Sequence, residues 1–125
     1  MGYSPLGRGW LTGQLQRFED IPENDYRRHQ PRFQPPAFNE NVKLVKAVEQ
    51  IAKRKQATVG QVAIAWVRWQ GAIPIPGATK VERVVENSAD ISLSEEELEE
   101  IQKFLDTLPI QGERYGGEFE KLLNQ

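Results

Sequence analysis

Residues 72–87 constrain the fold more than any other segment of the chain. Ile73 and Ile75 alternate in the manner of a short, half-buried strand. Gly77 follows them and predicts a turn at a place where a Cβ atom would be in the way. The pattern therefore predicts a strand that leads through a glycine turn directly into a helix.

The predicted helix gathers positive charge at its first turns. Thr79 stands three residues before Glu82, the spacing of a capping box. Lys80, Arg83 and Asn87 share one helical face, and three residues are expected to pack on the other: Val81, Val84 and Val85. A helix N-terminus with free amides and two cations can hold a phosphate. From these residues alone, a capped surface helix with solvated charges is an equally good interpretation.

Three ordered motifs resemble one family. The string Ile73-Pro-Ile-Pro-Gly-Ala-Thr-Lys-x-x-Arg-x-x-Glu-Asn87 resembles the last strand and following helix of the aldo-keto reductases, which are (β/α)8 barrels that use NADPH. Tyr3-Ser-Pro-Leu-Gly-Arg-Gly-Trp-Leu-Thr-Gly13 resembles the seventh strand and its loop. Ile21-Pro-Glu-Asn-Asp-Tyr-Arg-Arg-His-Gln-Pro-Arg-Phe33 resembles the variable loop of the branch related to pyridoxal reductases and plant or fungal aldehyde reductases.

The resemblance implies an α/β fold that is the C-terminal quarter of a TIM barrel. We expect about two parallel strands and four to five helices, with residues 1–125 forming part of an NADP-dependent oxidoreductase domain. A complete barrel is not expected, since the chain has 125 residues and a whole barrel needs about 250.

The motif Tyr3–Gly13 implies one end of a cofactor site. By resemblance, Tyr3 stacks on the nicotinamide, while three residues line the pyrophosphate path: Ser4, Leu6 and Arg8. Read without the resemblance, Tyr3 is more often a core aromatic residue and Arg8 a surface charge.

The motif Ile73–Asn87 implies the other end of that site. By resemblance, Lys80 and Arg83 meet the 2′-phosphate, because arginine offers a planar fork to phosphate oxygens. Thr79 and the amides after Gly77 would cap the same anion. Two further residues would bond the adenine amino group: Glu86 and Asn87. Ala78 departs from this pattern, since it offers only its backbone.

The family's catalytic tetrad of Asp, Tyr, Lys and His lies on earlier strands, and no stretch of this chain resembles those strands. The single histidine, His29, falls in a polar loop. We therefore expect the NADP(H)-binding part of an enzyme that reduces aldehydes or ketones by hydride transfer, without catalysis by the chain alone. The alternatives are a non-catalytic NADP(H)-binding module and a structural fragment that is active only in association with another chain.

Composition limits the partners. The net charge is −2, which gives no general attraction to nucleic acid or to an anionic membrane. The chain has no cysteine, so disulfides and thiolate metal sites are excluded, and no metal site is predicted. No apolar run is long enough to cross a bilayer, and we expect a cytoplasmic protein.

The remaining segments are read from periodicity. Residues 14–38 hold no sustained period and predict a long loop on the cofactor and substrate side, which four aromatic residues are expected to anchor: Phe18, Tyr26, Phe33 and Phe38. Helices are predicted from caps at Asn39, Thr58 and Ser94. Residues 109–125 are expected to form a tail, and its part from Gly112 to Gln125 is expected to hold a short last helix anchored by three residues: Phe119, Leu122 and Leu123. The strands 2–6 and 72–76 should have unpaired edges, which predicts self-association.

Overall fold

The computed structural model describes residues 1–113. The predicted last helix of the tail falls on residues 114–125 and lies outside the described residues. The elements are, in order, β1 (Gly2–Tyr3), η1 (Gly7–Thr12), η2 (Phe18–Asp20), η3 (Tyr26–His29), η4 (Pro31–Phe33), α1 (Ala37–Arg54), α2 (Val59–Trp69), β2 (Pro74–Ile75), α3 (Val81–Ser88) and α4 (Glu95–Thr107), where η marks a short 3₁₀ helix.

The two predicted strands pair in parallel. Gly2 lies opposite Pro74 and Tyr3 opposite Ile75. Each strand is only two residues long, so the predicted ranges 2–6 and 72–76 were too long. Prolines at 5, 74 and 76 remove ladder donors, and Ser4 has a positive φ of 50°, which ends β1.

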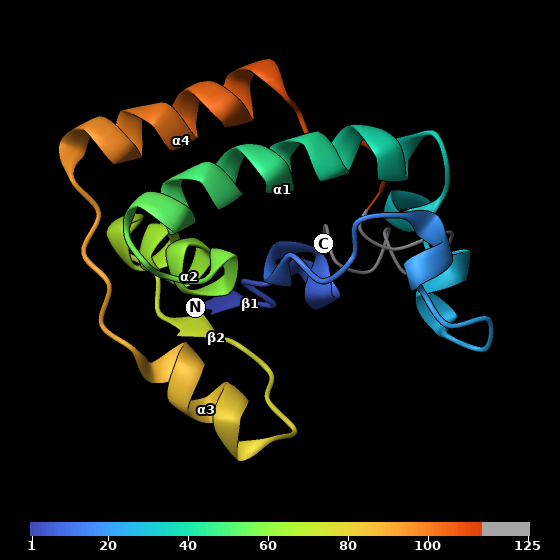
Figure 1. The fold of residues 1–125 in the computed structure, drawn as a ribbon, viewed down its shortest axis with the longest axis horizontal. Coiled ribbons are helices and arrows are strands. Elements are labelled where there is room, and N and C mark those ends of the chain that lie inside the picture. The colour runs from blue at the N-terminus through green and yellow to red at the C-terminus, as the bar shows by residue number, and fades with distance from the viewer. Residues whose placement is uncertain (114–125) are drawn as a thin grey trace.

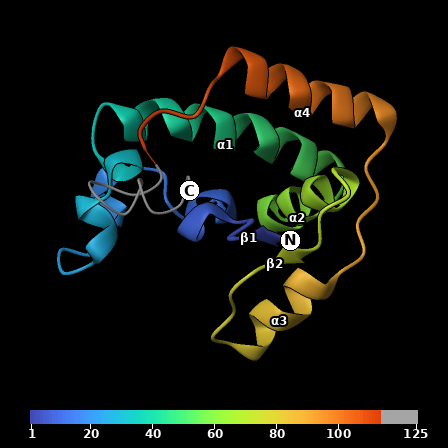
Figure 2. The ribbon, with the colours of Figure 1, turned by 180° about the vertical axis from the view of Figure 1, so that it is seen from behind.

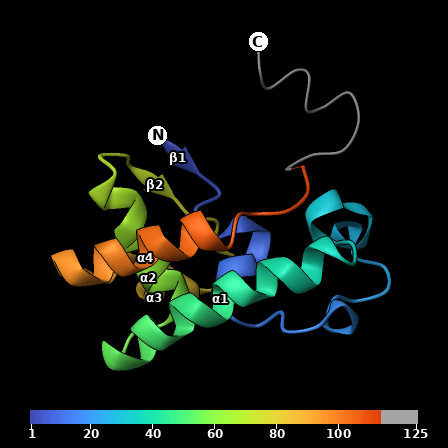
Figure 3. The same cartoon turned by 90° about the horizontal axis from the view of Figure 1, so that it is seen from above.

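Behind this small sheet the helices form stacked layers. In Figure 1, α2 lies next to the two strands, α1 crosses over α2, and α4 runs along the outer side of α1. Figure 3 shows α1 and α4 lying side by side. Seen from behind in Figure 2, α3 projects from the opposite side of the sheet, away from this helical stack.

The hydrophobic core lies between the helices and the loop and hardly involves the strands. Its fully buried side chains come from α1, α2 and the segment before α1: Phe33, Phe38, Ile21, Ile51, Ile64 and Val62. α4 turns an apolar stripe toward the core, because Leu98 and Ile101 are buried and Leu105 packs against the core. Two ion pairs also join α4 to α1, one between Lys55 and Glu97 at 3.0 Å and one between Arg54 and Glu100.

Two of the three predicted capping boxes are present. Thr58 with Gln61 begins α2, and Ser94 with Glu97 begins α4. The predicted cap at Asn39 was wrong, since α1 begins at Ala37, where proline at the preceding position supplies a preset φ. The acidic first turn of α4 complements the helix dipole.

The segment 14–38 is built from three short 3₁₀ turns, which is consistent with the absence of a longer period. Phe33 and Phe38 are buried and pack on Trp10, with ring centroids 5.1 and 4.5 Å from it. Phe18 is partly buried against the same cluster. The expectation for Tyr26 was wrong, because 60% of that residue is exposed.

No helix among the described residues combines the length and the apolar composition that crossing a membrane requires.

Candidate functional site

A polar hollow lies where the chain leaves the two strands. It is bordered by the end of η1, the N-terminus of α2 and the first turns of α3, and its lining residues are Thr12, Gln14, Thr58, Lys80, Glu82, Arg83 and Glu86. In α/β folds with parallel strands, ligands bind at the carboxyl ends of the strands. The position of this hollow makes it a candidate binding site.

Glu86 is the most connected residue of the hollow. Arg83 Nη1 donates to Glu86 Oε2 at 2.9 Å, and Thr58 Oγ1 donates to Glu86 Oε1 at 2.8 Å. Gln61 Nε2 also donates to the Glu86 carbonyl oxygen at 3.2 Å. The prediction foresaw Arg83 and Glu86 on one helix, but not their mutual bond or the contribution of α2.

Lys80 completes the positive side of the hollow. It is exposed, and within residues 1–113 it has no carboxylate partner within ion-pair distance. Lys80 and Arg83 therefore face the same hollow with one ammonium free and one guanidinium paired through a single nitrogen. Two carboxylates, those of Glu82 and Glu86, line the same hollow.

The start of α3 differs from the prediction. Its N-cap is Lys80, with an extended backbone and no side-chain cap, so the expected capping box of Thr79 with Glu82 is absent. Gly77 has no heavy atom within 4 Å of an added Cβ and has no positive φ, so the steric reason given for that glycine was wrong. Neither Gly77 nor Thr79 lines the hollow.

The valine face of α3 is also different from expectation. Val81, Val84 and Val85 were expected to pack, but they are 76%, 53% and 68% exposed. The one buried residue of α3 is Asn87, at 8% exposed. Its Nδ2 has no acceptor among the described residues, which leaves a buried donor unsatisfied.

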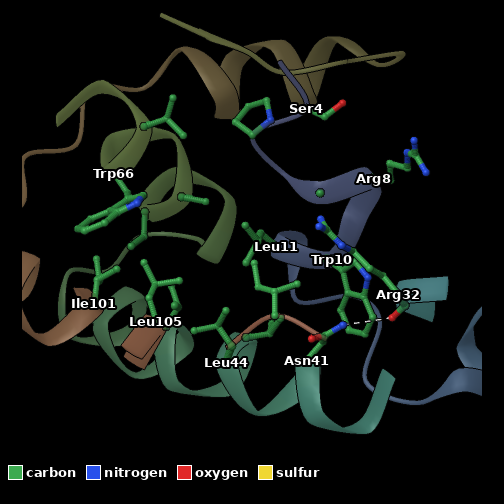
Figure 4. A pocket seen from close by; sticks show the side chains of 18 of the residues that line it. Ser4, Arg8, Trp10, Leu11, Arg32, Asn41, Leu44, Trp66, Ile101 and Leu105 are labelled. Atoms are coloured by element: carbon green, nitrogen blue, oxygen red, sulfur yellow. Dashed lines mark hydrogen bonds between the residues drawn. The ribbon is translucent and has the colours of Figure 1, made fainter. Parts of the chain in front are cut away.

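A second, apolar cavity of about 310 Å³ lies on the other side of η1. Figure 4 shows it between η1 and the faces of α1, α2 and α4, with Trp10 and Leu44 on its walls. Tyr3, Ser4 and Arg8 line the end of the cavity near β1. The buried Nε1 of Trp10 has no acceptor among the described residues.

The loop after β1 is held by polar contacts. Arg8 has a positive φ of 58°, a strained conformation for a residue with a side chain. Its Nη1 donates to Gln30 Oε1 at 2.6 Å, and its carbonyl accepts from Arg27 Nη1 at 3.0 Å. Arg27 is paired with Asp25 at 2.6 Å, and hydrogen bonding from Arg27 lowers the pKa of Asp25. The segment 14–38 therefore holds the motif Tyr3–Gly13 in place through Arg27 and Gln30.

The predicted site residues fall into two groups. Lys80, Arg83 and Glu86 meet at the polar hollow, whereas Tyr3, Ser4 and Arg8 line the apolar cavity. Leu6 lines neither, and it approaches the hollow through Gly60 at the start of α2. A Cβ added to Gly60 would lie 3.4 Å from Leu6 Cδ2 and 3.7 Å from Glu86 Oε1. The sequence motifs gave no sign of Gly60, Thr58 or Gln61 as part of the site.

No group of three or more metal-ligating side chains occurs among residues 1–113. His29 lies exposed at the end of η3, as its position in a polar loop predicts.

Two adjacent parallel strands, each followed by helical segments, with a polar hollow beyond their carboxyl ends, are the arrangement of neighbouring units in a (β/α)8 barrel. The Aldo/keto reductase family model matches residues 1–106. The chain belongs to this family. The predicted fold class, a partial barrel with no closed sheet, is confirmed.

Relatives agree with this assignment. The chain is 47% identical over 119 residues to an aldo-keto reductase of Gibberella moniliformis, covering 92% of this chain and 36% of that protein. It is 40% identical over 117 residues to aldo-keto reductase yakc [NADP(+)] of Schizosaccharomyces pombe, covering 90% and 34%. The solved structure of glycerol dehydrogenase AKR11B4 from Gluconobacter oxydans superposes with a TM-score of 0.75 at 30% identity, covering 89% and 35%. The chain thus spans about a third of the length of these proteins.

Proposed function

We propose that this chain is the C-terminal, NADP(H)-binding part of an aldo-keto reductase that reduces aldehydes or ketones. The observation that carries the proposal is that Lys80 and Arg83 line the same hollow, beyond the carboxyl end of β2. A dianionic 2′-phosphate fits two adjacent cations, and a charge-assisted bond to phosphate is about twice as strong as a neutral one. The relative named for NADP(+) supports the choice of cofactor.

The residues of the hollow fit the adenine end of the cofactor. Arg83 keeps two guanidinium nitrogens unpaired among the described residues, and Lys80 is free to turn toward the phosphate. Asn87 does not line the hollow, and its buried Nδ2 has no acceptor among the described residues; its contact with adenine is kept as a proposal from the resemblance. We propose that Thr79 and Gly77 contribute only backbone amides, because neither residue lines the hollow.

The nicotinamide end would lie along the loop after β1. We propose that Tyr3 stacks on the nicotinamide ring, since 49% of Tyr3 is exposed at the strand end. Ser4, Leu6 and Arg8 would follow the pyrophosphate along η1. The glycines of this loop give it the left-handed turns that it contains, with φ of 56° at Gly7 and 97° at Gly9.

The cofactor supplies the hydride when it is bound, and reduction also needs a proton donor. By resemblance that donor is a tyrosine on an earlier strand of the barrel. We therefore propose that these 125 residues hold the cofactor, and that an upstream part of the barrel supplies the proton and selects the carbonyl substrate. The isolated chain is then not catalytic.

The test is a titration of the purified chain with NADPH and NADH, followed by calorimetry and by thermal unfolding. A ligand that binds only the folded state raises the unfolding temperature, so NADPH should raise it more than NADH does. Arg83→Ala should remove this preference. Arg68→Ala is the matched control, since Arg68 pairs with Asp90 at 3.6 Å and lies outside the hollow. An unchanged preference in Arg83→Ala would refute the assignment of the phosphate.

A second candidate, a fragment that acts by association, is favoured by the exposed strands. Ile73 and Ile75 are 71% and 48% exposed beside a sheet of two strands. Parallel strands in barrels are normally paired on both edges and covered on both faces. We propose that this edge accepts a further strand from a barrel segment or from a second copy.

The chain's other partners follow from charge. We propose no nucleic-acid or membrane partner, because the net charge is −2. We propose a cytoplasmic location, in keeping with the absence of cysteine from the sequence.

A further inference from the structure

The position of α3 depends on polar contacts more than on packing. It is an eight-residue helix with one buried residue, and its valines face outward. Its N-terminus has no side-chain cap. A helix this short and this exposed gains little stability from burial, and short helices are marginal without tertiary support. The contacts with α2 therefore decide where its charged residues point.

The contacts come from the N-terminus of α2. Thr58 Oγ1 donates to Glu86 Oε1 at 2.8 Å, and Gln61 Nε2 donates to the Glu86 carbonyl at 3.2 Å. The remaining carboxylate oxygen of Glu86 binds Arg83 Nη1 at 2.9 Å. Each oxygen of the carboxylate thus has its own donor, and the chain of bonds runs from α2 through Glu86 to the guanidinium.

We propose that Thr58, with Gln61, is a positioning residue that sets selectivity for a 2′-phosphorylated nucleotide by holding Glu86 as the anchor of Arg83. The inference rests on the proposed cofactor site. Thr58 itself binds no phosphate in this arrangement. It restricts the rotamers of Glu86, and Glu86 in turn keeps the guanidinium fork beside Lys80, which lowers the entropy cost of gripping an anion.

Thr58 has two duties that experiment can separate. Its Oγ1 accepts from Gln61 N at 3.1 Å as the cap of α2, and the same hydroxyl donates to Glu86. Ser94 performs the capping duty alone at α4, where it accepts from Glu97 N at 3.2 Å. Ser94→Ala is therefore a matched control for the loss of a helix cap without the loss of the Glu86 bond.

The experiment measures dissociation constants for NADPH and NADH by calorimetry, well below the unfolding temperature of each variant. Thr58→Val should weaken NADPH binding about fivefold, the effect of one hydrogen bond, and weaken NADH binding clearly less. Thr58→Ser should restore the wild-type values. Ser94→Ala should lower the unfolding temperature without changing either constant. If Thr58→Val does not fold, Thr58→Gly replaces it, since glycine is tolerated at a cap.

The outcomes separate the two proposals. Equal weakening of both nucleotides, no weakening of either, or the same loss of selectivity in Ser94→Ala would overturn the positioning role while leaving the cofactor site intact. A wild-type chain that binds neither nucleotide would overturn the proposed function, and the positioning role with it. A wild-type preference for NADPH that Thr58→Val selectively reduces supports both.

Discussion

Three carboxylates keep their negative charge to lower pH than usual. The pKa of Asp20 is lowered by hydrogen bonds from the backbone amides of Gln16 and Arg17, and that of Asp25 by the side chain of Arg27. Burial alone would raise the pKa of Glu97, but its bonds to Ser94 and Lys55 outweigh burial and lower it. The pKa is lowered in all three groups.

These shifts predict acid sensitivity. A carboxyl group whose pKa is lower in the folded state stabilises the fold above its unfolded pKa, and this contribution is lost as pH falls through the folded value. We expect the unfolding temperature to be steady above about pH 5 and to fall below about pH 4. Thermal unfolding followed by circular dichroism at a series of pH values measures this dependence. Glu97→Gln, which keeps the capping box, should make the fall shallower; an unfolding temperature that rises on acidification would contradict this.

Trp10 offers a test of an unsatisfied donor in the core. Trp10 is 6% exposed and stacks on Phe33 and Phe38, yet its Nε1 has no acceptor in the described residues. Trp10→Phe keeps one aromatic ring in the cluster and removes the unsatisfied N–H, so it should cost clearly less than removal of the whole ring system. Trp10→Ala should cost about 3–5 kcal/mol. Urea unfolding compares the two, and equal costs would show that the indole N–H is satisfied in solution.

At the scale of elements, the same sequence signal gave different results in different places. The capping boxes at Thr58 and Ser94 are confirmed, while the one at Thr79 was wrong. The backbone remains extended through Lys80, with φ of −129° and ψ of 145°, so α3 begins later than Thr79 could cap it. Spacing predicts which residues can cap, but the path of the chain out of β2 decides whether the helix begins there.

Two substitutions test whether α3 stands apart from the core. Val45 on α1 is 2% exposed, whereas Val85 on α3 is 68% exposed. Val45→Ala removes buried methyl groups and should cost about 2 kcal/mol, while Val85→Lys should change the free energy of unfolding by less than about 0.5 kcal/mol. Chemical denaturation measures both. A large cost for Val85→Lys would mean that the valine face is covered in solution.

Capping-box spacing predicted the starts of α2 and α4, because the box is local in sequence. It could not predict the connection of Thr58 to Glu86, which spans 28 residues and joins two helices. Nor could it show that Tyr3 and Arg83 line different cavities. The residues of the hollow could be nominated by the motif, but their partners depend on how the helices are placed.

For the whole molecule, the exposed strand edge predicts association. Ile75 is 48% exposed on β2, which is paired with β1 alone in the described sheet. Size-exclusion chromatography over a dilution series should show elution that shifts toward the monomer as the chain is diluted. Ile75→Lys should favour the monomer at all concentrations, because a lysine on an edge strand opposes pairing. Elution of the wild type as a monomer throughout would contradict this prediction.

The architecture of the piece was predictable mainly through resemblance. Composition and period indicate helices and short strands, but the parallel pairing of Gly2–Tyr3 with Pro74–Ile75 joins segments about 70 residues apart in sequence. Short, proline-interrupted strands carry too little pattern for that pairing to be deduced. The cavity of about 310 Å³ was not foreseen, since it depends on the shapes left between packed helices.

The location of the core outside α3 has a consequence for protein engineering. The eight residues of α3 carry the candidate phosphate-binding residue Arg83, with Lys80 directly before them, but contribute only Asn87 to the buried interior. Substitutions that change nucleotide preference could therefore be made over most of α3 with little effect on the stability that α1, α2 and α4 provide. The residues nominated for ligand preference and those that stabilise the fold are therefore largely separate in this chain.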